Sequence, residues 1–438
     1  MIKKMLLFLI VFSFILISGC VPEKNIQIDD TTASISKDQK VLPQNTEKLQ
    51  LGTLCSGQEE CVSFCHNNKG RCTQYCKEHS DNNLCGIVFP FKTNTSSSSL
   101  CKGTKVMFDN APVNLEKTEL FLPLGLMSGG HVTPVDHHYF QNFANQEADI
   151  EVYSPGYGVI TEIQHMPGAP DKKDYRVVIQ HTCTISSIFI HIEILSDKLA
   201  SQASENFAGT NIQVKAGEVI GWYKTNVDYN IVDNEVTLSG FVIPEHYQEQ
   251  DPWKIHVPNT YEYFNEPIKS ELLAKSVRTI EPRAGKIDYD IDGKLVGNWF
   301  EEESNGYAGK GGKEYWQSHL SFTYDFLDPS LIIVSMADYG GIPNQFAIKG
   351  NTPDPAKISK DDGIINYELV SWGYTTEKGE EWNKVKLAKI IKATGGTHVA
   401  GTVVVQMLED RKIKFETFPG KTSSQVIGFT DNAKIYER

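Results

Sequence analysis

The middle of the chain carries short runs of apolar, mostly β-branched and aromatic residues. Clear runs occupy 158–163, 175–180 and 188–192, and Gly, Pro, Asp and Ser punctuate the stretches between them. Runs of this length and composition predict β-strands. No long pattern of helical period interrupts them. One helix is expected near 267–278, because Pro267 suits a first helical turn and good helix formers follow it.

The last third of the chain continues this pattern. Its predicted strands lie at 331–334, 364–370, 402–407 and 413–418. The last two flank a polar turn at 409–412 and therefore predict a hairpin. Roughly 150 residues of regularly spaced strands are typical of a barrel or a sandwich. We expect a mainly β protein, with one β domain over 101–285 and a β-barrel-like domain over 286–438.

The start of the chain has a different pattern. Lys3 and Lys4 precede an apolar run over 5–17, and Ser-Gly leads directly into Cys20. The run is about 13 residues long, whereas a membrane-spanning helix needs about 20. The segment resembles the lipobox of prokaryotic lipoproteins, which implies cleavage before Cys20 and lipidation of its thiol. We expect residues 1–20 to be a lipoprotein signal peptide and the mature protein to be extracytoplasmic, anchored to the cell membrane through Cys20. An ordinary signal peptide with an incidental cysteine is the alternative.

Composition narrows the picture further. The chain has 438 residues, 40% of them hydrophobic, and a formal net charge of −13. That length predicts roughly two to three domains. No basic stripe is present, so nucleic acid is not an expected partner. Residues 21–50 are polar and poor in aromatic side chains, which predicts a flexible tether between the anchor and the folded part.

Nine cysteines are present, and eight remain once Cys20 is assigned to the lipid. An even number in an exported chain predicts disulfides. A zinc site built from the same cysteines is the alternative, because CxxxC pairs also bind metal.

Residues 51–92 form a small cysteine-rich module. Cys61 and Cys65 are four positions apart, as are Cys72 and Cys76, and an Asn-Asn-Lys-Gly turn separates the pairs. In a helix this spacing places both thiols on one face. We expect an antiparallel helical hairpin stapled by Cys61–Cys76 and Cys65–Cys72, and its spacing resembles that of alpha-hairpinins. The other four should pair among themselves, with Cys101–Cys183 tying the linker to the β domain: Cys55, Cys85, Cys101 and Cys183.

Between residues 125 and 235 five segments carry a recognisable pattern. They are 129–136, 152–160, 175–181, 189–192 and 214–221. In content and order they resemble segments of the LytM-type, or lysostaphin-type, zinc endopeptidases, and the second and fifth match most closely. The resemblance implies a duplicated-hybrid-motif β fold for this region.

The chemistry of that family needs one zinc ion held by a His, an Asp and a second His, with an open position for water. The resemblance makes His131 and Asp136 the first two ligands, with one residue more between them than in the family. His191 would be an assisting base. His181, which ends the third segment, is the other candidate catalytic residue.

The family closes its site with a His-x-His strand soon after the fifth segment. Here Asp228 and Asn230 stand in that place, and a neutral amide is a poor zinc ligand. The alternative uses His256 as the third ligand, with Lys254 at the assisting position, and needs an insertion of about two dozen residues. We favour the Asp228–Asn230 register on spacing.

His137 and His138 follow Asp136 directly. Because neighbours in an extended strand point to opposite faces, only one of the two can join a given site. A zinc site and a purely structural role are both open for this cluster.

A further resemblance concerns the start of the last domain. Residues 295–300 contain Gly297-Asn298-Trp299, which is similar to the GxW signature of lipocalin-like barrels, where the Trp plugs one end. Three functions follow from these patterns. We favour a surface module that binds an envelope polymer or a partner protein. The alternatives are an active zinc endopeptidase or amidase acting on envelope peptides, and a carrier of a small apolar ligand in the C-terminal barrel.

Overall fold

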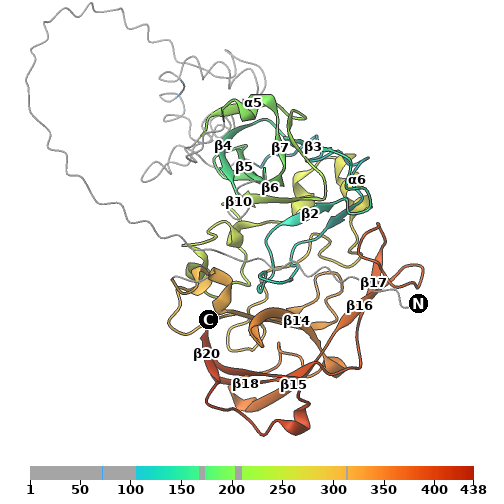
Figure 1. Ribbon diagram of the computed structural model, residues 1–438. Coiled ribbons are helices and arrows are strands. Elements are labelled where there is room, and N and C mark those ends of the chain that lie inside the picture. The colour runs from blue at the N-terminus through green and yellow to red at the C-terminus, as the bar shows by residue number, and fades with distance from the viewer. Residues whose placement is uncertain (1–71, 73–104, 167–172, 203–209, 312–313) are drawn as a thin grey trace, which may run out of the picture. The chain divides into compact units, whose positions relative to one another are not determined.

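Strands dominate the architecture (Figure 1). The computed structural model describes residues 72, 105–166, 173–202, 210–311 and 314–438, all within one unit, Leu49–Arg438. The expected mainly β fold is confirmed. The predicted signal peptide, tether and helical hairpin lie outside the described residues, apart from Cys72.

The first large sheet has seven antiparallel strands. In spatial order they are β1 (Leu120–Leu122), β2 (His138–Gln141), β10 (Asn226–Asp233), β6 (Ile185–Ile192), β5 (Tyr175–Gln180), β4 (Gly158–His165) and β8 (Ile212–Val214). The strands predicted at 158–163, 175–180 and 188–192 are confirmed as parts of β4, β5 and β6.

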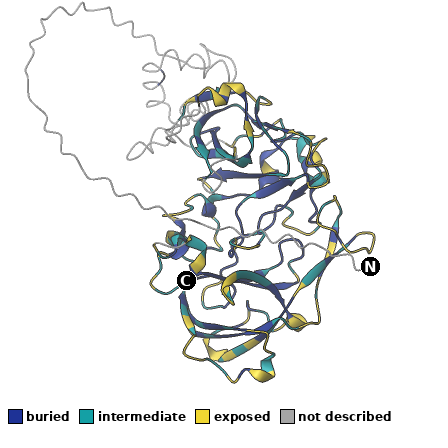
Figure 2. Ribbon diagram, in the orientation of Figure 1, coloured by how far each residue is buried: buried dark blue, intermediate teal, exposed yellow. Residues whose placement is uncertain are grey.

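A second, smaller sheet lies against the first. It consists of β3 (Ile150–Tyr153), β9 (Val219–Tyr223) and β7 (Ile194–Leu195). One core cluster contains buried side chains from both sheets, among them Val152, Phe189 and Ile220. Figure 2 shows this burial along the strands, while the connecting loops carry most of the exposed residues. Side chains from both sheets therefore form the core, as a two-layer β structure requires.

Helices are few and short in the described part of the chain. The predicted helix near 267–278 is confirmed as α6 (Ile268–Lys275), and Pro267 precedes it. The remaining helical elements are α5 (Asp197–Ala200), η1 (Pro244–Tyr247), η2 (Lys254–His256), η3 (Thr260–Tyr263), η4 (Gly306–Ala308), η5 (Tyr315–Ser318), η6 (Lys349–Asn351), η7 (Lys360–Asp362) and η8 (Ser423–Gln425). No described helix is both long and apolar enough to cross a membrane.

The last part of the chain forms a closed eight-stranded barrel. Its strands, in order, are β11 (Gly297–Glu301), β12 (His319–Tyr324), β13 (Ile332–Tyr339), β14 (Ile342–Ile348), β15 (Ile364–Val370), β18 (Gly401–Glu409), β19 (Lys412–Pro419) and β20 (Lys434–Glu437). The predicted hairpin is confirmed as β18 and β19. A separate two-stranded sheet, β16 (Trp372–Thr376) and β17 (Ile390–Gly395), interrupts the barrel order in sequence.

Buried side chains fill the inside of the barrel. The cluster includes Leu320, Val334, Leu369, Val403 and Phe415, which come from five different strands. An eight-stranded barrel is just wide enough for side chains to fill it. The barrel interior is therefore a packed core.

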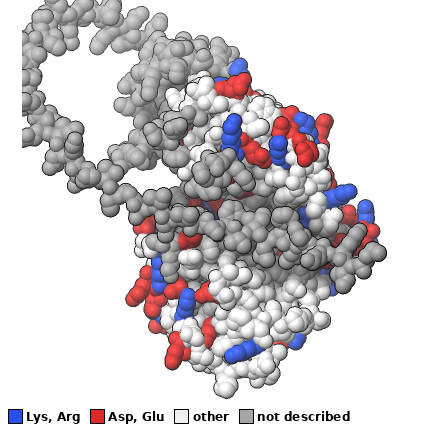
Figure 3. Space-filling model, viewed as in Figure 1, with Lys and Arg blue, Asp and Glu red and all other residues white. Residues whose placement is uncertain are grey.

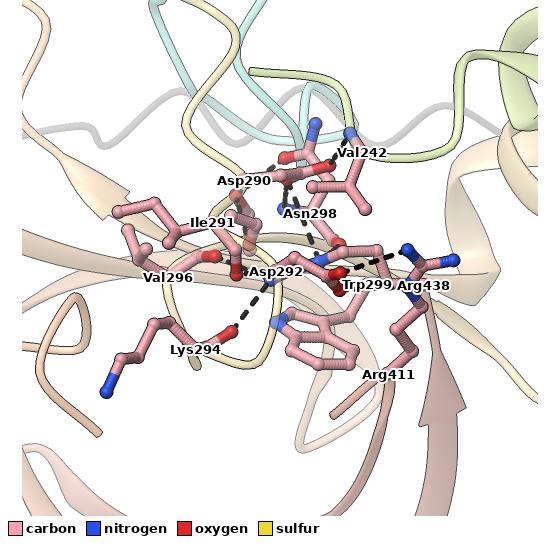
Figure 4. Close-up of polar contacts among 12 residues, drawn as sticks. Val242, Asp290, Ile291, Asp292, Lys294, Val296, Asn298, Trp299, Arg411 and Arg438 are labelled. Carbon is pink, nitrogen blue, oxygen red and sulfur yellow. Dashed lines mark hydrogen bonds and ion pairs between the residues drawn. The ribbon is translucent and has the colours of Figure 1, made fainter. Parts of the chain in front are cut away.

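The tryptophan of the predicted GxW segment belongs to this core. Trp299 is fully buried, and its indole N–H donates to the carbonyl of Leu295 at 2.8 Å. The guanidinium carbon of Arg438 lies 4.0 Å from the ring centroid of Trp299 (Figure 4). Arg438 also donates to the carbonyl of Val296 at 2.5 Å. The first barrel strand and the end of the chain are thus joined by one stacked and hydrogen-bonded pair.

Steric constraints explain why the same segment has a glycine at position 297. Gly297 has φ +117°, and a Cβ there would collide with the carboxylate of Asp290. That carboxylate accepts a hydrogen bond from the backbone N–H of Asn298 at 2.8 Å. Only glycine allows this close approach.

Described residues on either side of position 286 share a core. One cluster combines Leu120 and Val277 with Phe326, Ile333 and Tyr374. The boundary predicted between 285 and 286 therefore lies within continuous packing.

Two polar contacts reinforce this junction. Arg278 is buried and donates to the carbonyl of Phe326 at 2.6 Å. The side-chain amide of Gln345 both accepts from the N–H of Gly129 and donates to its carbonyl, each at 3.1 Å.

The structure describes two of the eight predicted disulfide cysteines, Cys72 and Cys183, and both are disulfide-bonded. Their predicted partners, Cys65 and Cys101, lie outside the described residues, so the connectivity stays a prediction. On the face shown in Figure 3, Lys and Arg lie among Asp and Glu and form no large field of one sign.

Candidate functional site

Three neighbouring strands bring the predicted site residues together. The strand β10 lies between β2 and β6, with Asp228 opposite Tyr139 on one side and Ile190 on the other. His137 immediately precedes β2, and His191 lies near the end of β6. The register therefore places Asp228 between the two histidines.

A row of alternating carboxylates and imidazoles crosses these strands. An oxygen of Asp136 lies 3.3 Å from Nδ1 of His137, and Nε2 of His137 lies 3.3 Å from Oδ2 of Asp228. The same oxygen of Asp228 lies 3.5 Å from Nε2 of His191. Nδ1 of His191 lies 3.1 Å from both oxygens of Asp174. Five side chains thus form one continuous row, here called the His–Asp row.

Charge pairing within the row favours protonated histidines. Burial alone would lower the pKa of His137, but Asp228 and Asp136 outweigh it and raise that pKa above its ordinary value. Burial likewise opposes protonation of His191, yet Asp174 and Asp228 raise its pKa. An imidazolium donates from both nitrogens and accepts from neither, so it suits a position between two carboxylates.

His191 has an unusual backbone conformation. Its φ is +73°, in a region that residues with a Cβ seldom occupy. Its side chain is 42% exposed, although both ring nitrogens face carboxylates. Strained backbone of this kind clusters at functional sites, where the surrounding contacts hold it. His191 is thus the member of the row that is both constrained and accessible from solvent.

Lys254 supplies a buried positive charge next to the row. It is fully buried, and its ammonium donates to the carbonyl of Pro134 at 2.7 Å. Burial would raise the pKa of Asp136, but the charge of Lys254, followed by His137, holds it well below its ordinary range. Burial also lowers the pKa of Lys254 itself, against the opposing effect of Asp136 and Asp251. The carboxylate of Asp136 thus has an internal cation nearby, while its Oδ2 has no hydrogen-bond partner among the described residues.

His131 lies at the edge of this arrangement. It is exposed, and its ring centroid is 5.8 Å from that of His137. Its backbone is fixed by a tight turn in which Ser128 and His131 exchange hydrogen bonds of 3.2 and 3.0 Å. His131 is therefore near the row without a direct polar contact to it.

The other predicted site residues lie elsewhere. His256 pairs with the backbone, since its Nδ1 lies 2.5 Å from the carbonyl of Val236, and none of its described contacts reaches His131 or Asp136. His181 is buried and contacts the carbonyl of Tyr157 at 2.8 Å and the hydroxyl of Ser187 at 2.9 Å. Burial lowers the pKa of His181 to about 4. These positions give His181 the environment of a core histidine.

The neighbours of Asp136 and Asp228 follow strand alternation. His138 is fully buried, between the carbonyl of Leu122 and the hydroxyl of Thr260, while His137 joins the row. Asn230 is buried two residues beyond Asp228 and pairs with Ile188.

Sequence reasoning missed Asp174 and brought Lys254 to the site only in the alternative register, as the neighbour of His256. A signal for Lys254 existed, because a lysine at the predicted assisting position is unusual in a zinc site. No comparable signal existed for Asp174.

The described residues do not fit a three-ligand zinc site. They contain no group of three or more His, Cys, Asp or Glu side chains arranged to hold a metal ion. A carboxylate, Asp228, lies between His137 and His191, and a buried ammonium lies near Asp136.

A cavity opens beside the accessible end of the row. Its volume is about 640 Å³, and its lining includes His191, Asp174 and Asn226. Charges of both signs surround it, including Glu193 and Lys224. The cavity thus offers a polar surface with donors and acceptors next to the constrained histidine.

No protein-family model matches the chain, and no curated protein matches it significantly. Among solved structures, Csd3 from Helicobacter pylori overlaps 30% of this chain and 31% of its own, at 14% identity and a TM-score of 0.21. A zinc-containing peptidase from Vibrio cholerae overlaps 30% of this chain and 38% of its own, at 17% identity and a TM-score of 0.22. The chain thus matches little more than a third of either protein at most. Overlaps this weak say nothing about activity.

Proposed function

We propose that this chain is an extracytoplasmic lipoprotein whose LytM-type β domain binds a peptide of the cell envelope without cutting it. One observation carries the proposal: the buried ammonium of Lys254 lies near Asp136. The sequence register that puts Asp228 at the position of the closing histidine agrees with it.

Two cations would compete for the carboxylate of Asp136, the ammonium of Lys254 and a zinc ion. Inside a protein, where the effective dielectric constant is about 20, opposite charges attract about four times as strongly as in water, and a divalent ion doubles the attraction of a single charge. An ammonium near Asp136 therefore weakens the binding of zinc to that carboxylate. It also stabilises the carboxylate without any metal, because it supplies the opposite charge that a buried Asp needs.

The binding surface follows from the cavity beside His191. It combines carboxylates, ammonium groups and an amide around a half-exposed imidazole. A peptide with free amino and carboxyl groups matches such mixed charges.

The test uses the full-length protein in detergent micelles and a mixture of soluble peptidoglycan peptides. We expect calorimetry to detect binding in the presence of EDTA, and mass spectrometry to detect no cleavage after zinc is added. His191→Gln should weaken binding at least five-fold. His398→Gln, which changes an exposed histidine of the barrel region, should leave it unchanged.

The alternative is an active zinc peptidase. Zinc bound in stoichiometric amount, together with cleavage that Asp136→Asn abolishes, would establish it and overturn the proposal. The hypothesis of an apolar ligand in the barrel has no comparable support, because side chains such as Val334, Val403 and Phe415 fill the barrel interior.

A further inference from the structure

A second cavity lies at the junction between the LytM-type region and the barrel. Its volume is about 310 Å³. It is lined by the turn that follows β1, by Gln141 and Phe143, by barrel residues and by the β16–β17 hairpin. We propose that this cavity binds a pyranose ring of an acidic glycan, with aromatic side chains against the faces of the sugar and Lys384 against its carboxylate.

Fixed aromatic rings form one wall. The indole N–H of Trp372 donates to Oδ2 of Asp325 at 3.0 Å, and the hydroxyl of Tyr374 donates to the same oxygen at 2.7 Å. The indole N–H of Trp382 donates to the carbonyl of Lys386 at 2.7 Å. These three rings cannot turn without losing hydrogen bonds. A ligand therefore meets aromatic surfaces that are already in position, which lowers the entropic cost of binding.

The ring chemistry favours a sugar. The face of an aromatic ring is electron-rich and attracts the positive edge of a C–H bond. A pyranose presents such C–H groups on its faces and hydroxyls around its edge. The lining supplies apolar surface from Phe143 and Met127 and polar groups from Ser128 and Gln141. Its volume is at the lower end of the range for ligand pockets, about 300 to 1,000 Å³, and suits a single ring better than a long chain.

The charge of the lining favours an acidic sugar. Asp325 is fully engaged, because it accepts from both aromatic donors and from the N–H groups of Leu327 and Asp328, each at 2.9 Å. Among the described residues of the lining, Lys384 is the only lysine or arginine; its ammonium lies 5.6 Å from the ring centroid of Tyr374. The ammonium of Lys384 is therefore the charged group of the lining that is left to pair with a ligand. It disfavours a quaternary ammonium, which three aromatic rings could otherwise attract.

The opposite wall is held in place by the barrel. Gln345 lines the cavity, makes two hydrogen bonds to Gly129 beside Ser128, and also donates to the hydroxyl of Ser335 at 3.2 Å. The cavity shares no lining residue with the one beside His191. Sugar binding in this cavity is therefore independent of whether the LytM-type domain binds or cuts peptides.

The test compares two sugars that differ by one acidic group. Saturation-transfer NMR on the full-length protein in nanodiscs would use N-acetylmuramic acid and N-acetylglucosamine as probes. We expect signals for both, with the acidic sugar binding at least five-fold more tightly. Hexanoate and choline test the apolar and cationic alternatives, and neither should displace the sugar.

Variants at the cavity edge keep the test independent of folding. Phe143 and Lys384 are both exposed, so Phe143→Ala and Lys384→Gln should leave the fold intact. Phe143→Ala should weaken both sugars, whereas Lys384→Gln should remove only the preference for the acidic one. Ile342→Ala and Lys392→Gln, at exposed positions outside the cavity, are the matched controls. Absence of sugar binding, insensitivity to both cavity variants, or displacement by hexanoate or choline would each overturn the proposal.

Discussion

At the scale of single residues, adjacent histidines have opposite roles. His137 joins the His–Asp row, and His138 is enclosed between Leu122 and Thr260. Strand alternation alone predicts that only one of them reaches the site. The buried cation beside the row, Lys254, could not be predicted in this way. Lys254 lies 120 positions from its hydrogen-bond acceptor Pro134, and a single sequence gives no measure of such long-range proximity.

The role of Lys254 in balancing charge predicts a specific coupling. Lys254→Met should lower the free energy of unfolding by roughly 2–4 kcal/mol, because it removes one of the two cationic groups that face the buried Asp136 and leaves its charge only partly compensated. Adding Asp136→Asn removes the uncompensated charge, so the double variant should be less destabilised than the sum of the single effects by at least about 1 kcal/mol. Urea unfolding of the three variants measures this. Strictly additive effects would show that Lys254 acts through packing alone.

Buried neutral histidines predict acid sensitivity. Burial lowers the pKa of His319 to about 3, and its ring contacts the carbonyl of Tyr307 at 3.0 Å. Between pH 6.5 and about 3 the unfolded chain takes up a proton at this position and the folded chain does not. The free energy of unfolding therefore falls as pH falls, by about 1.4 kcal/mol per pH unit for one such group.

His319→Gln removes the titrating group and keeps a donor for the carbonyl of Tyr307. Unfolding free energies measured at several pH values should show a slope smaller by about 1.4 kcal/mol per pH unit than in the unchanged protein. His398→Gln serves as the exposed control. Equal slopes in all three proteins would contradict the buried neutral state of His319.

At the scale of elements, the strands are the most predictable part. Their β-branched runs are bounded by turn residues, and β5 and β15 begin and end where the sequence indicates. The predicted Asp228–Asn230 segment lies within β10, and its register against β2 and β6 fixes what faces the site. The segment that carries Lys254 is less predictable. It forms the 3-10 turn η2, and turns lack the periodic pattern by which strands are identified.

The position of β10 between β2 and β6 predicts that two substitutions can create a zinc site. Asp228→His supplies the imidazole that the LytM-type resemblance would put at this position, and Lys254→Gln removes the competing cation. The double variant should bind zinc at least ten-fold more tightly than either the unchanged protein or Asp228→His alone, because both obstacles must be removed. Calorimetric titration with zinc measures this. Equal zinc affinities would show that something other than residues 228 and 254 prevents binding.

At the scale of the whole molecule, the sequence predicts two β parts but not how closely they are packed. The shared cluster of Leu120 and Phe326, together with the bond from Arg278, joins residues on both sides of position 286. The predicted boundary followed changes in pattern along the chain, and such changes carry no information about contacts between distant segments.

The predicted anchor bears on where the whole molecule resides. Cys20→Ala should either leave an uncleaved precursor or release the protein from membranes, because the lipid would have no thiol to join. Membrane fractionation and intact-mass analysis measure both outcomes. Ser36→Ala, in the predicted tether, is a control that leaves the lipobox-like segment and the disulfide cysteines unchanged. A processed, membrane-bound Cys20→Ala protein would contradict lipidation at this position.

The barrel closure fixes the order in which the molecule can be completed. The strand β11 pairs with β20 through Phe300 and Glu437, and Arg438 stacks on Trp299. During synthesis or passage through a translocation channel, β11 emerges well over a hundred residues before its second neighbour. Until then its outer edge is an open template for other strands. The barrel should therefore be vulnerable to mispairing until its last strand appears, whereas every strand of the seven-stranded sheet has emerged by residue 233.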